Sequence, residues 1–306
     1  MIQYFMYKFG LFVIHCIPKK WAYAFARWMS EQHFLRSKKD REAVMRNLRQ
    51  ITRSEEGLWE KARSVFQNFG VYLIDFFFMY KTVNQKFIEE NVVIKGWDNF
   101  EKAHARGKGV IILTAHIGNW EMGAALLGRL GHSLMAVALP HKERRVNELF
   151  NRQRQNYGVT VIPVNTAVRR CIEALKKNKC VALLGDRDFG TFGEPLPFFG
   201  RPTLIPKGAS FFSLKTGAAI LPSFVIPQGD GTYELSFGEA ILPPERTSGD
   251  DQAAMLDLMK RSVGAIEEKI RANPTHWLMF REFGIEYEDL HPNPRVQRVA
   301  GARSRR

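Results

Sequence analysis

Short apolar runs alternate with amphipathic stretches through the middle of the chain. The apolar runs resemble buried strands, whereas the stretches between them repeat apolar residues every three or four positions, as helices do. Strands are expected at residues 110–114, 134–139, 159–164 and 180–184, and helices at residues 119–130, 144–156 and 168–177. Because strands without polar alternation are buried on both faces, this pattern predicts an α/β sheet covered by helices on each side.

The chain before residue 87 has helical periodicity instead. Apolar residues recur three and four positions apart at 42–51 and again at 58–68. Residues 71–80 form a second, very aromatic stretch in the same region. This stretch either joins the protein core or faces a membrane, and the pattern alone leaves both interpretations open.

Two further strands, at 220–226 and 233–241, and a closing helix at 252–272 complete the chain. The sequence holds no internal repeats and no low-complexity linker, so we expect a single mixed, largely parallel sheet flanked by helices. The predicted organisation is an N-terminal membrane-associating helix at residues 1–30, an α/β domain at residues 31–290, and a basic, disordered tail at residues 291–306.

The first segment is apolar and aromatic but too short to cross a membrane. Residues 2–17 are interrupted by Lys8 and His15, whereas a spanning helix needs about 20 apolar residues. A secretory signal would begin with basic residues and end at a small-residue cleavage site, and neither is evident here. The composition favours a helix that lies in the membrane interface; an ordinary core helix is the alternative.

The net charge of the chain limits the classes of binding partner to be considered. It has 45 Lys and Arg against 31 Asp and Glu, for a formal net charge of +14. Nucleic acid, anionic lipid surfaces, acidic carrier proteins and phosphorylated small molecules all fit this balance. No recognisable nucleic-acid-binding module accompanies the charge, so we expect no nucleic-acid partner.

Candidate chemistry lies at the junction of the first central strand and the helix after it. The run from Leu113 to Glu121 reads Leu-Thr-Ala-His-Ile-Gly-Asn-Trp-Glu. With Gly118 as the turn, Glu121 in the first helical turn can approach His116 on the loop. A histidine held by a carboxylate can act as a general base near neutral pH. Amide N–H groups near Asn119 can also stabilise developing negative charge. On spacing alone, a structural histidine is the better explanation of the pair.

The wider set of motifs resembles the bacterial lipid A biosynthesis (late) acyltransferases, within the lysophospholipid acyltransferase superfamily. The matching string is Thr-Ala-His-x-Gly-Asn-Trp-Glu, which contains the HxxxxD/E pattern at His116 and Glu121. The resemblance continues at Arg46-Asn47-Leu48, at Asn147 with Arg154-x3-Gly158, at Gly185-Asp186-Arg187-Asp188-Phe189-Gly190, at Pro197-Phe198-Phe199-Gly200 and at His276-Trp277-x3-Arg281. It therefore covers nearly the whole chain.

The resemblance implies a role for each matching residue. His116 is the expected base and Glu121 its orienting partner, although in some relatives the carboxylate equivalent to Asp186 orients the histidine instead. The residues expected to contact substrate are Asn119, Asn147, Arg154, Asp186 and Arg187. Relatives often carry Asp-Gln or Asp-His where this chain has Asp186-Arg187, and this difference bears on which acceptor is preferred.

A segment rich in Phe, Gly and Pro follows the last of these motifs. Phe189, Phe198 and Phe199 are the candidates for a hydrophobic groove that holds an acyl chain, with plain core packing as the alternative. Burying each methylene of such a chain contributes about 0.8 kcal/mol, so a groove of this kind would dominate donor affinity.

The predicted function is transfer of a fatty acyl chain from acyl carrier protein or acyl-CoA to a hydroxyl of a membrane glycolipid, a lipid A precursor by resemblance. The chemistry needs neither a cofactor nor a metal. We expect a monotopic protein at the cytoplasmic face of the inner membrane, held by its N-terminal helix. Its three cysteines form no CxxC pair, as is typical of a reduced protein.

Two alternatives of other classes remain. The string Asp186-Arg187-Asp188 has the DxD form that holds a divalent metal and a nucleotide diphosphate in glycosyltransferases. A non-catalytic lipid-binding protein would share the groove and the basic surface. Neither alternative explains the pairing of His116 with a carboxylate.

Overall fold

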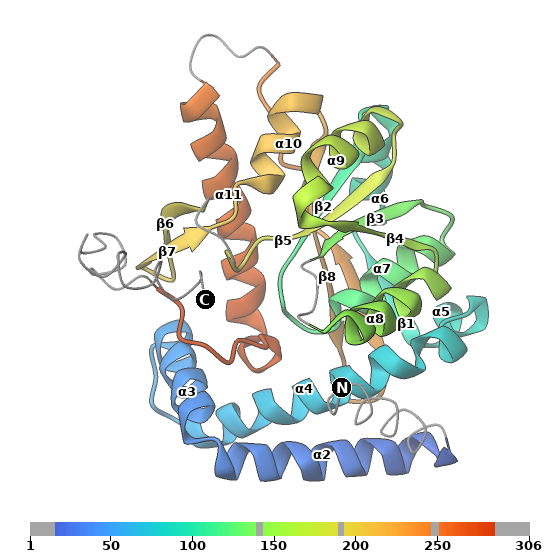
Figure 1. Ribbon diagram of the computed structural model, residues 1–306. Helices are drawn as coiled ribbons and strands as arrows, with labels where there is room; N and C mark the ends of the chain where they lie inside the picture. Colours follow the sequence, from blue (N-terminus) through green and yellow to red (C-terminus); the bar gives the residue numbers. More distant parts are fainter. Residues whose placement is uncertain (1–15, 139–142, 189–192, 246–250, 285–306) are drawn as a thin grey trace, which may run out of the picture.

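The computed structural model describes residues 16–138, 143–188, 193–245 and 251–284, and shows an α/β domain with a layer of long helices across one end (Figure 1). The helices are α2 (Lys19–Arg36), α3 (Lys38–Thr52), α4 (Leu58–Thr82), α5 (Gln85–Asn91), α6 (Trp97–Ala105), α7 (Trp120–Arg129), α8 (Arg144–Asn156), α9 (Ala167–Lys176), α10 (Gly208–Thr216) and α11 (Asp251–Ala272), with 3-10 turns η1 (Val164–Thr166) and η2 (Pro274–His276). The strands are β1 (Val92–Lys95), β2 (Val110–Thr114), β3 (Leu134–Ala138), β4 (Val159–Pro163), β5 (Cys180–Leu184), β6 (Glu194–Phe198), β7 (Arg201–Ile205), β8 (Ala219–Pro227) and β9 (Tyr233–Phe237).

Seven of the described strands form one sheet in the order β1-β9-β8-β2-β5-β3-β4. Neighbouring strands run parallel except β8 and β9, which form an antiparallel pair. The prediction of a single mixed, largely parallel sheet is therefore confirmed. The strand β2 lies at the middle of the sheet and is buried along its whole length, as its unbroken apolar sequence requires.

Helices cover both faces of the sheet, and alternate residues of β2 point to opposite faces. Ile111 and Leu113 join a core with α9, α10 and α11, whereas Val110 and Ile112 join a core with α4, α6, α7 and α8. This two-sided burial is the arrangement that the alternating strand and helix pattern predicts.

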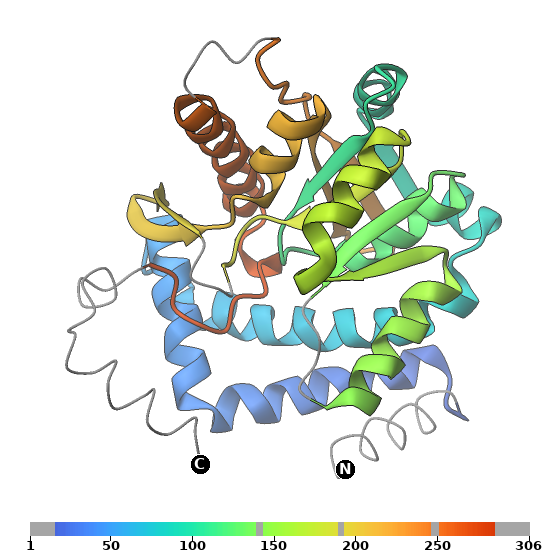
Figure 2. The ribbon, with the colours of Figure 1, turned by 45° about the horizontal axis from the view of Figure 1, so that its top comes forward.

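The helices α2 and α4 lie side by side beneath the sheet in both views of the ribbon (Figures 1 and 2). Of the two interpretations of the aromatic stretch, core packing is correct: Tyr72, Ile74, Phe76, Phe77 and Met79 are all buried in α4. In the described part of the chain, no helix is both long enough and apolar enough to cross a membrane.

The domain boundaries predicted from the sequence fall partly outside the described residues. Residues 1–15 and 285–306 lie outside them, which includes half of the predicted N-terminal helix and the whole basic tail. Within the described part, α2 runs unbroken through residue 30 and packs against α4, so that position lies inside a helix.

The segment expected to form an acyl groove folds instead into the small antiparallel hairpin β6-β7, followed by α10. Pro195, Pro197 and Pro202 occupy this hairpin, and proline usually disfavours a strand assignment. A two-stranded hairpin tolerates proline because the outward-facing N–H positions need no partner, which explains why the sequence pattern missed it.

Candidate active site

The register of the two central strands brings the histidine and a carboxylate together. Thr114 at the end of β2 is the partner of Leu184 at the end of the neighbouring parallel strand β5. His116 and Asp186 each follow two residues later, so both side chains emerge at the same edge of the sheet. Ligands bind at this carboxyl edge in open α/β sheets.

His116 and Asp186 form a direct pair. The imidazole Nδ1 lies 2.8 Å from Asp186 Oδ1, and the backbone N–H of His116 donates to Asp186 Oδ2 at 3.2 Å. An ionised carboxylate only accepts hydrogen bonds, so Nδ1 must carry the ring proton. The other nitrogen, Nε2, is then the one that can accept a proton. The His116 side chain keeps 18% of its surface exposed, which leaves it reachable by a substrate.

Asp186 is held in its charged form although it is fully buried. Burial alone would raise the pKa of this carboxyl, but the His116 imidazole, the Arg187 guanidinium and a hydrogen bond from Trp277 together hold its pKa well below the usual range. Trp277 Nε1 donates to Asp186 Oδ2 at 2.9 Å. Asp186 therefore stays a carboxylate throughout the neutral pH range.

Residues 276–283, which we call the strap, pair with the loop that carries His116. Gly118 N donates to His276 O at 2.9 Å, and Leu278 N donates to His116 O at 2.8 Å. Ile117 and Trp277 form an antiparallel bridge between these two bonds. The strap thus fixes the backbone on both sides of Ile117 in the His116 loop and places the Trp277 indole against Asp186.

The turn into α7 explains the Gly-Asn sequence after the histidine. Gly118 has a φ of +60°, and a Cβ there would lie 2.0 Å from Val225 O, so only glycine fits. Asn119 caps the helix: its side chain accepts from Met122 N at 3.0 Å, and the residue is fully buried. The backbone N–H of Asn119 donates to Val225 O, so in this structure both its N–H and its side chain already have partners within the protein. Contact of Asn119 with substrate stays a prediction.

Glu121 lies with Arg154 rather than with His116. Arg154 donates to both carboxylate oxygens of Glu121, at 2.6 to 3.1 Å, and both side chains are largely buried. This two-pronged contact joins α7 to α8. Glu121 was expected to orient His116. In the structure the carboxylate next to His116 Nδ1 is that of Asp186. Arg154 likewise contacts a protein carboxylate where a substrate contact was expected.

The other polar residues named from the sequence, Asn147, Arg187 and Asp188, lie in different surroundings. Asn147 lies half-buried in the first turns of α8. Arg187 donates to Leu278 O and lies 3.7 Å from Asp186, so it supports the strap and the carboxylate. Asp188 Oδ2 accepts from Gly193 N at 2.9 Å. The two aspartates of the DxD string therefore have separate partners, and the glycosyltransferase interpretation loses its basis.

Two of the three phenylalanines named for the acyl groove, Phe198 and Phe199, pack in the protein core. Phe189 lies outside the described residues. Phe198 and Phe199 are buried, with 1% and 5% of their surface exposed, and their rings contact Trp277 and Phe283. The core-packing alternative is therefore correct for these two residues. Both rings thus pack against the side chains of the strap.

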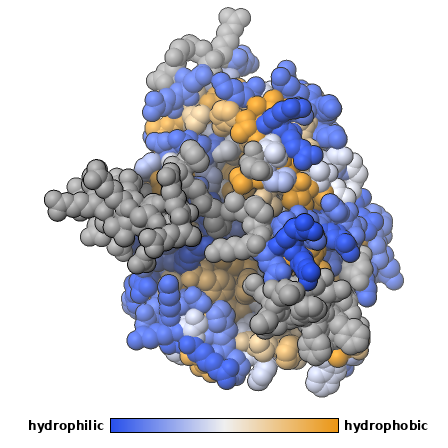
Figure 3. Space-filling view, in the orientation of Figure 1, coloured by the Kyte–Doolittle hydropathy of each residue, from blue (hydrophilic) through white to orange (hydrophobic). Residues whose placement is uncertain are grey.

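A small, largely apolar pocket lies beside the His116 loop, between α7 and the sheet. Thr114 and Trp120, two positions before and four after His116, contribute to its wall, and the Trp120 ring contacts the His116 ring at 5.1 Å. Its other lining residues are Ile112, Gly123, Ala124, Leu127, Leu134, Ala182, Ser223, Phe224, Val225 and Leu235. No charged side chain is among these lining residues. On the face in Figure 3, apolar residues gather towards the middle, within hydrophilic margins.

A buried carboxylate that the sequence analysis missed supports the same loop from below. Asp75 of α4 accepts hydrogen bonds from Tyr23 of α2, from Tyr233 of β9 at 2.9 Å and from Asn119 at 3.4 Å. Burial raises the pKa of Asp75, and the three donors oppose that rise. A lone aspartate within the apolar run Leu-Ile-Asp-Phe-Phe was the available signal, because such a residue needs buried partners.

The arrangement as a whole can perform general base catalysis. A buried carboxylate fixes the imidazole tautomer and stabilises the imidazolium that forms on proton transfer. Ser and Cys are absent from the loop between Thr114 and Glu121, so the loop offers the histidine no neighbouring nucleophile to activate. The site therefore suits deprotonation of a hydroxyl supplied by a substrate.

Comparison with known proteins gives a match over most of the chain. The model of the family described as bacterial lipid A biosynthesis acyltransferase matches residues 1–283. The phosphatidylinositol mannoside acyltransferase of Mycobacterium tuberculosis H37Rv is 29% identical over 237 residues, which are 76% of this chain and 72% of the relative. The lipid A biosynthesis palmitoleoyltransferase of Escherichia coli K12 is 25% identical over 188 residues, 60% of each chain.

Among solved structures, the 1-acyl-sn-glycerophosphate acyltransferase of Thermotoga maritima is similar to this chain. The likeness covers 89% of this chain and 98% of that one, with 17% sequence identity and a TM-score of 0.37. That score is too low for either fold or function to be taken from the Thermotoga protein.

Proposed function

The chain belongs to the bacterial lipid A biosynthesis acyltransferase family and is an acyltransferase; from this premise we propose that it transfers a fatty acyl chain from a thioester to a hydroxyl of a membrane glycolipid, with His116 as the general base. The observation that supports this most is the contact between His116 Nδ1 and the buried Asp186 carboxylate. We propose Asp186, rather than Glu121, as the group that orients the histidine.

In the proposed reaction the acceptor hydroxyl gives its proton to His116 Nε2 while its oxygen attacks the thioester carbonyl carbon. The tetrahedral intermediate then collapses, the carbon–sulfur bond breaks, and the departing thiolate takes the proton from the imidazolium. Asp186 stabilises the imidazolium between these two steps. No acyl-enzyme forms, because the acceptor attacks directly.

The proposed donor is a fatty acyl thioester of acyl carrier protein or of coenzyme A. Both donors are anionic, and the chain carries a formal net charge of +14. The proposed acceptor is a lipid A precursor or a related glycolipid. This choice draws on the names of the two relatives, one of which acts in lipid A biosynthesis and the other on a mannosylated phosphatidylinositol.

The proposed function is tested by acyl transfer in vitro. Purified protein is incubated with a donor whose fatty acyl chain is radiolabelled, either acylated acyl carrier protein or acyl-CoA. The acceptor is a lipid A precursor, a phosphatidylinositol mannoside or lysophosphatidic acid. We expect one of the two glycolipids to gain a labelled, alkali-labile acyl chain. Transfer to lysophosphatidic acid alone would contradict the glycolipid acceptor, and no transfer to any acceptor would contradict the proposed function.

We propose that the protein binds the cytoplasmic face of the inner membrane through α2 as well as through the segment before it. The outer face of α2 carries an apolar stripe at helical spacing, namely Trp21, Phe25, Trp28, Met29 and Leu35, each 48 to 62% exposed. The opposite face, with Ala22, Ala26 and Phe34, is buried against the protein. Such a stripe would be costly in water, and Trp is enriched at membrane interfaces.

The charge around this stripe suits an anionic lipid surface. Residues 16–39 contain six Lys or Arg residues and a single acidic residue, Glu31. Each basic residue close to an anionic membrane contributes about 1 kcal/mol of attraction. The stripe and its basic margins together resemble a helix that lies in the interface without crossing the bilayer.

Replacing Trp21 and Trp28 together by alanine is expected to weaken binding to vesicles that contain anionic phospholipid by roughly tenfold or more. The reason is the loss of two half-exposed indoles that would enter the interface, where a large apolar side chain contributes about 1.5–3 kcal/mol on full burial. Vesicle co-sedimentation measures the effect. The matched control replaces Val93 and Val168, which are similarly exposed but lie elsewhere on the surface, by serine. Equal binding by both double variants would place the membrane contact outside α2.

A further inference from the structure

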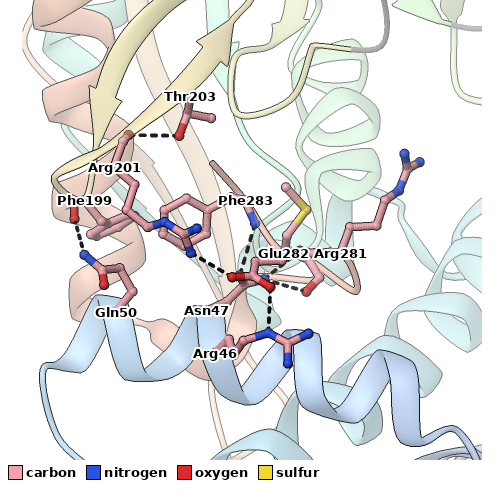
Figure 4. Close-up of polar contacts among 10 residues, drawn as sticks. Arg46, Asn47, Gln50, Phe199, Arg201, Thr203, Arg281, Glu282 and Phe283 are labelled. Atoms are coloured by element: carbon pink, nitrogen blue, oxygen red, sulfur yellow. Dashed lines mark hydrogen bonds and ion pairs between the residues drawn. The ribbon is translucent and has the colours of Figure 1, made fainter. Parts of the chain in front are cut away.

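A single amide on α3 binds the second half of the strap, after Leu278. Asn47 is 2% exposed, and within the described part of the chain its side chain forms its hydrogen bonds with the strap backbone. Its Nδ2 donates to Met279 O at 3.2 Å and to Arg281 O at 2.7 Å, and its Oδ1 accepts from Phe283 N at 3.2 Å. Figure 4 shows this amide facing the strap between Arg281 and Phe283.

These three hydrogen bonds satisfy strap backbone groups that a neighbouring strand would otherwise pair with. The strap beyond Leu278 belongs to no described helix or strand, yet buried backbone N–H and C=O groups need partners. A side-chain amide offers two donors and an acceptor at fixed geometry, which is what two carbonyls and one N–H require. Aspartate has no donor, and alanine has neither group, so the sequence at position 47 is tightly constrained.

A second contact between α3 and the strap is weaker. Glu282 accepts from Arg46 of α3 at 2.6 Å and from Arg201 of β7 at 2.9 Å (Figure 4). All three side chains are a third or more exposed, and exposed ion pairs contribute little because water and salt screen them. The buried Asn47 contacts therefore dominate the attachment of the strap to α3.

The strap connects Asn47 to the proposed catalytic pair. Two residues before the first Asn47 contact, Trp277 donates to Asp186, and Leu278 pairs with the His116 backbone. A shift of the strap by one position would remove both contacts. We infer that Asn47 is a positioning residue for acyl transfer: it sets the register of the strap so that Trp277 meets Asp186 beside His116. The catalytic part of this inference rests on the function proposed above.

The first test compares Asn47→Ala with Gln50→Ala in the full-length protein. Gln50 lies one turn further along α3 and donates to Phe199 O at 2.7 Å, so its replacement also removes a side-chain to backbone bond of α3 but no hydrogen bond to the strap backbone. Hydrogen exchange is measured by mass spectrometry in peptides that cover residues 113–120 and 276–283. Exchange in these peptides should be faster than in the wild type for Asn47→Ala, but not for Gln50→Ala. Unchanged exchange in a variant that folds, as judged by circular dichroism, would overturn the inference whatever the activity.

The second test uses acyl-transfer kinetics. Loss of a residue that orients a metal ligand commonly costs about 10- to 100-fold. Because Asn47 orients the strap, we expect a fall of the same order in kcat of Asn47→Ala, while KM stays within about threefold. The double variant with Trp277→Phe should have the same kcat as Trp277→Phe alone, because both changes act through one contact. Additive losses, or an unchanged kcat despite faster exchange, would show a merely structural role. Faster exchange in a protein that transfers no acyl chain would refute the proposed function and leave the strap attachment standing.

Discussion

Replacing His116 by glutamine is expected to lower kcat for acyl transfer by about 10²- to 10⁴-fold, the usual contribution of a general base. Glutamine keeps a polar side chain of similar size, so the fold and the contact with Asp186 are largely preserved, but its amide cannot accept the proton of the acceptor hydroxyl. KM should change little, because the proton is transferred only in the transition state. Steady-state transfer to the identified acceptor measures both constants.

The control for this variant is thermal unfolding, which should give a Tm close to that of the wild type. A His116→Gln protein that folds normally and transfers the acyl chain at the wild-type rate would show that the histidine is structural. In that case the contact with Asp186 would serve only to hold the loop after β2.

Replacing Asp186 by asparagine is expected to cost about 10²- to 10⁴-fold in kcat, comparable to losing the orienting carboxylate of a catalytic triad. Asp186 Oδ2 accepts from Trp277 and from the His116 backbone, so the asparagine oxygen would take that position. Its NH₂ group would then face His116 Nδ1 and force the ring proton onto Nε2. The nitrogen that should act as the base would already carry a proton.

Glu121→Gln is the matched control, because it also converts a buried carboxylate of the same region into an amide. Glu121 pairs with Arg154, so this change should lower the free energy of unfolding, by up to about 3–5 kcal/mol if the pair is broken, and alter kcat far less than Asp186→Asn. Chemical denaturation and kinetics separate the two effects. A larger loss of kcat in Glu121→Gln than in Asp186→Asn would reverse the assignment of the orienting group.

The central strands and helices of the fold were predictable from local pattern. The bounds expected for β2, α8 and β5 agree with the structure to the residue, because each combines an unbroken apolar run or a clear helical period with polar flanks. The short strand β1, the helix α6 and the proline-containing hairpin β6-β7 were missed. Their residues are placed by contacts with distant parts of the chain, which a local pattern does not contain.

The site was predictable in its histidine and only partly in its partners. The His116 loop could be recognised as a candidate site from its position after a buried strand and from the motif around it. The choice between Glu121 and Asp186 depends on the pairing of β2 with β5, which the sequence does not state. The contacts of Asn47 with the strap, and of Asp75 with Tyr23 and Tyr233, join residues far apart in the chain and are therefore invisible to spacing arguments.

The pairing of the strap with the His116 loop also bears on when the enzyme becomes active during its own synthesis. A ribosome releases β2, α7 and β5 long before Trp277 and Leu278 emerge, so the nascent sheet can form while Asp186 still lacks its indole donor and the loop lacks its backbone partner. Contacts of such wide sequence separation form late and slowly. The proposed catalytic pair therefore gains its full set of contacts only after the ribosome has released the chain through Leu278, and a shorter nascent chain is expected to transfer acyl groups poorly.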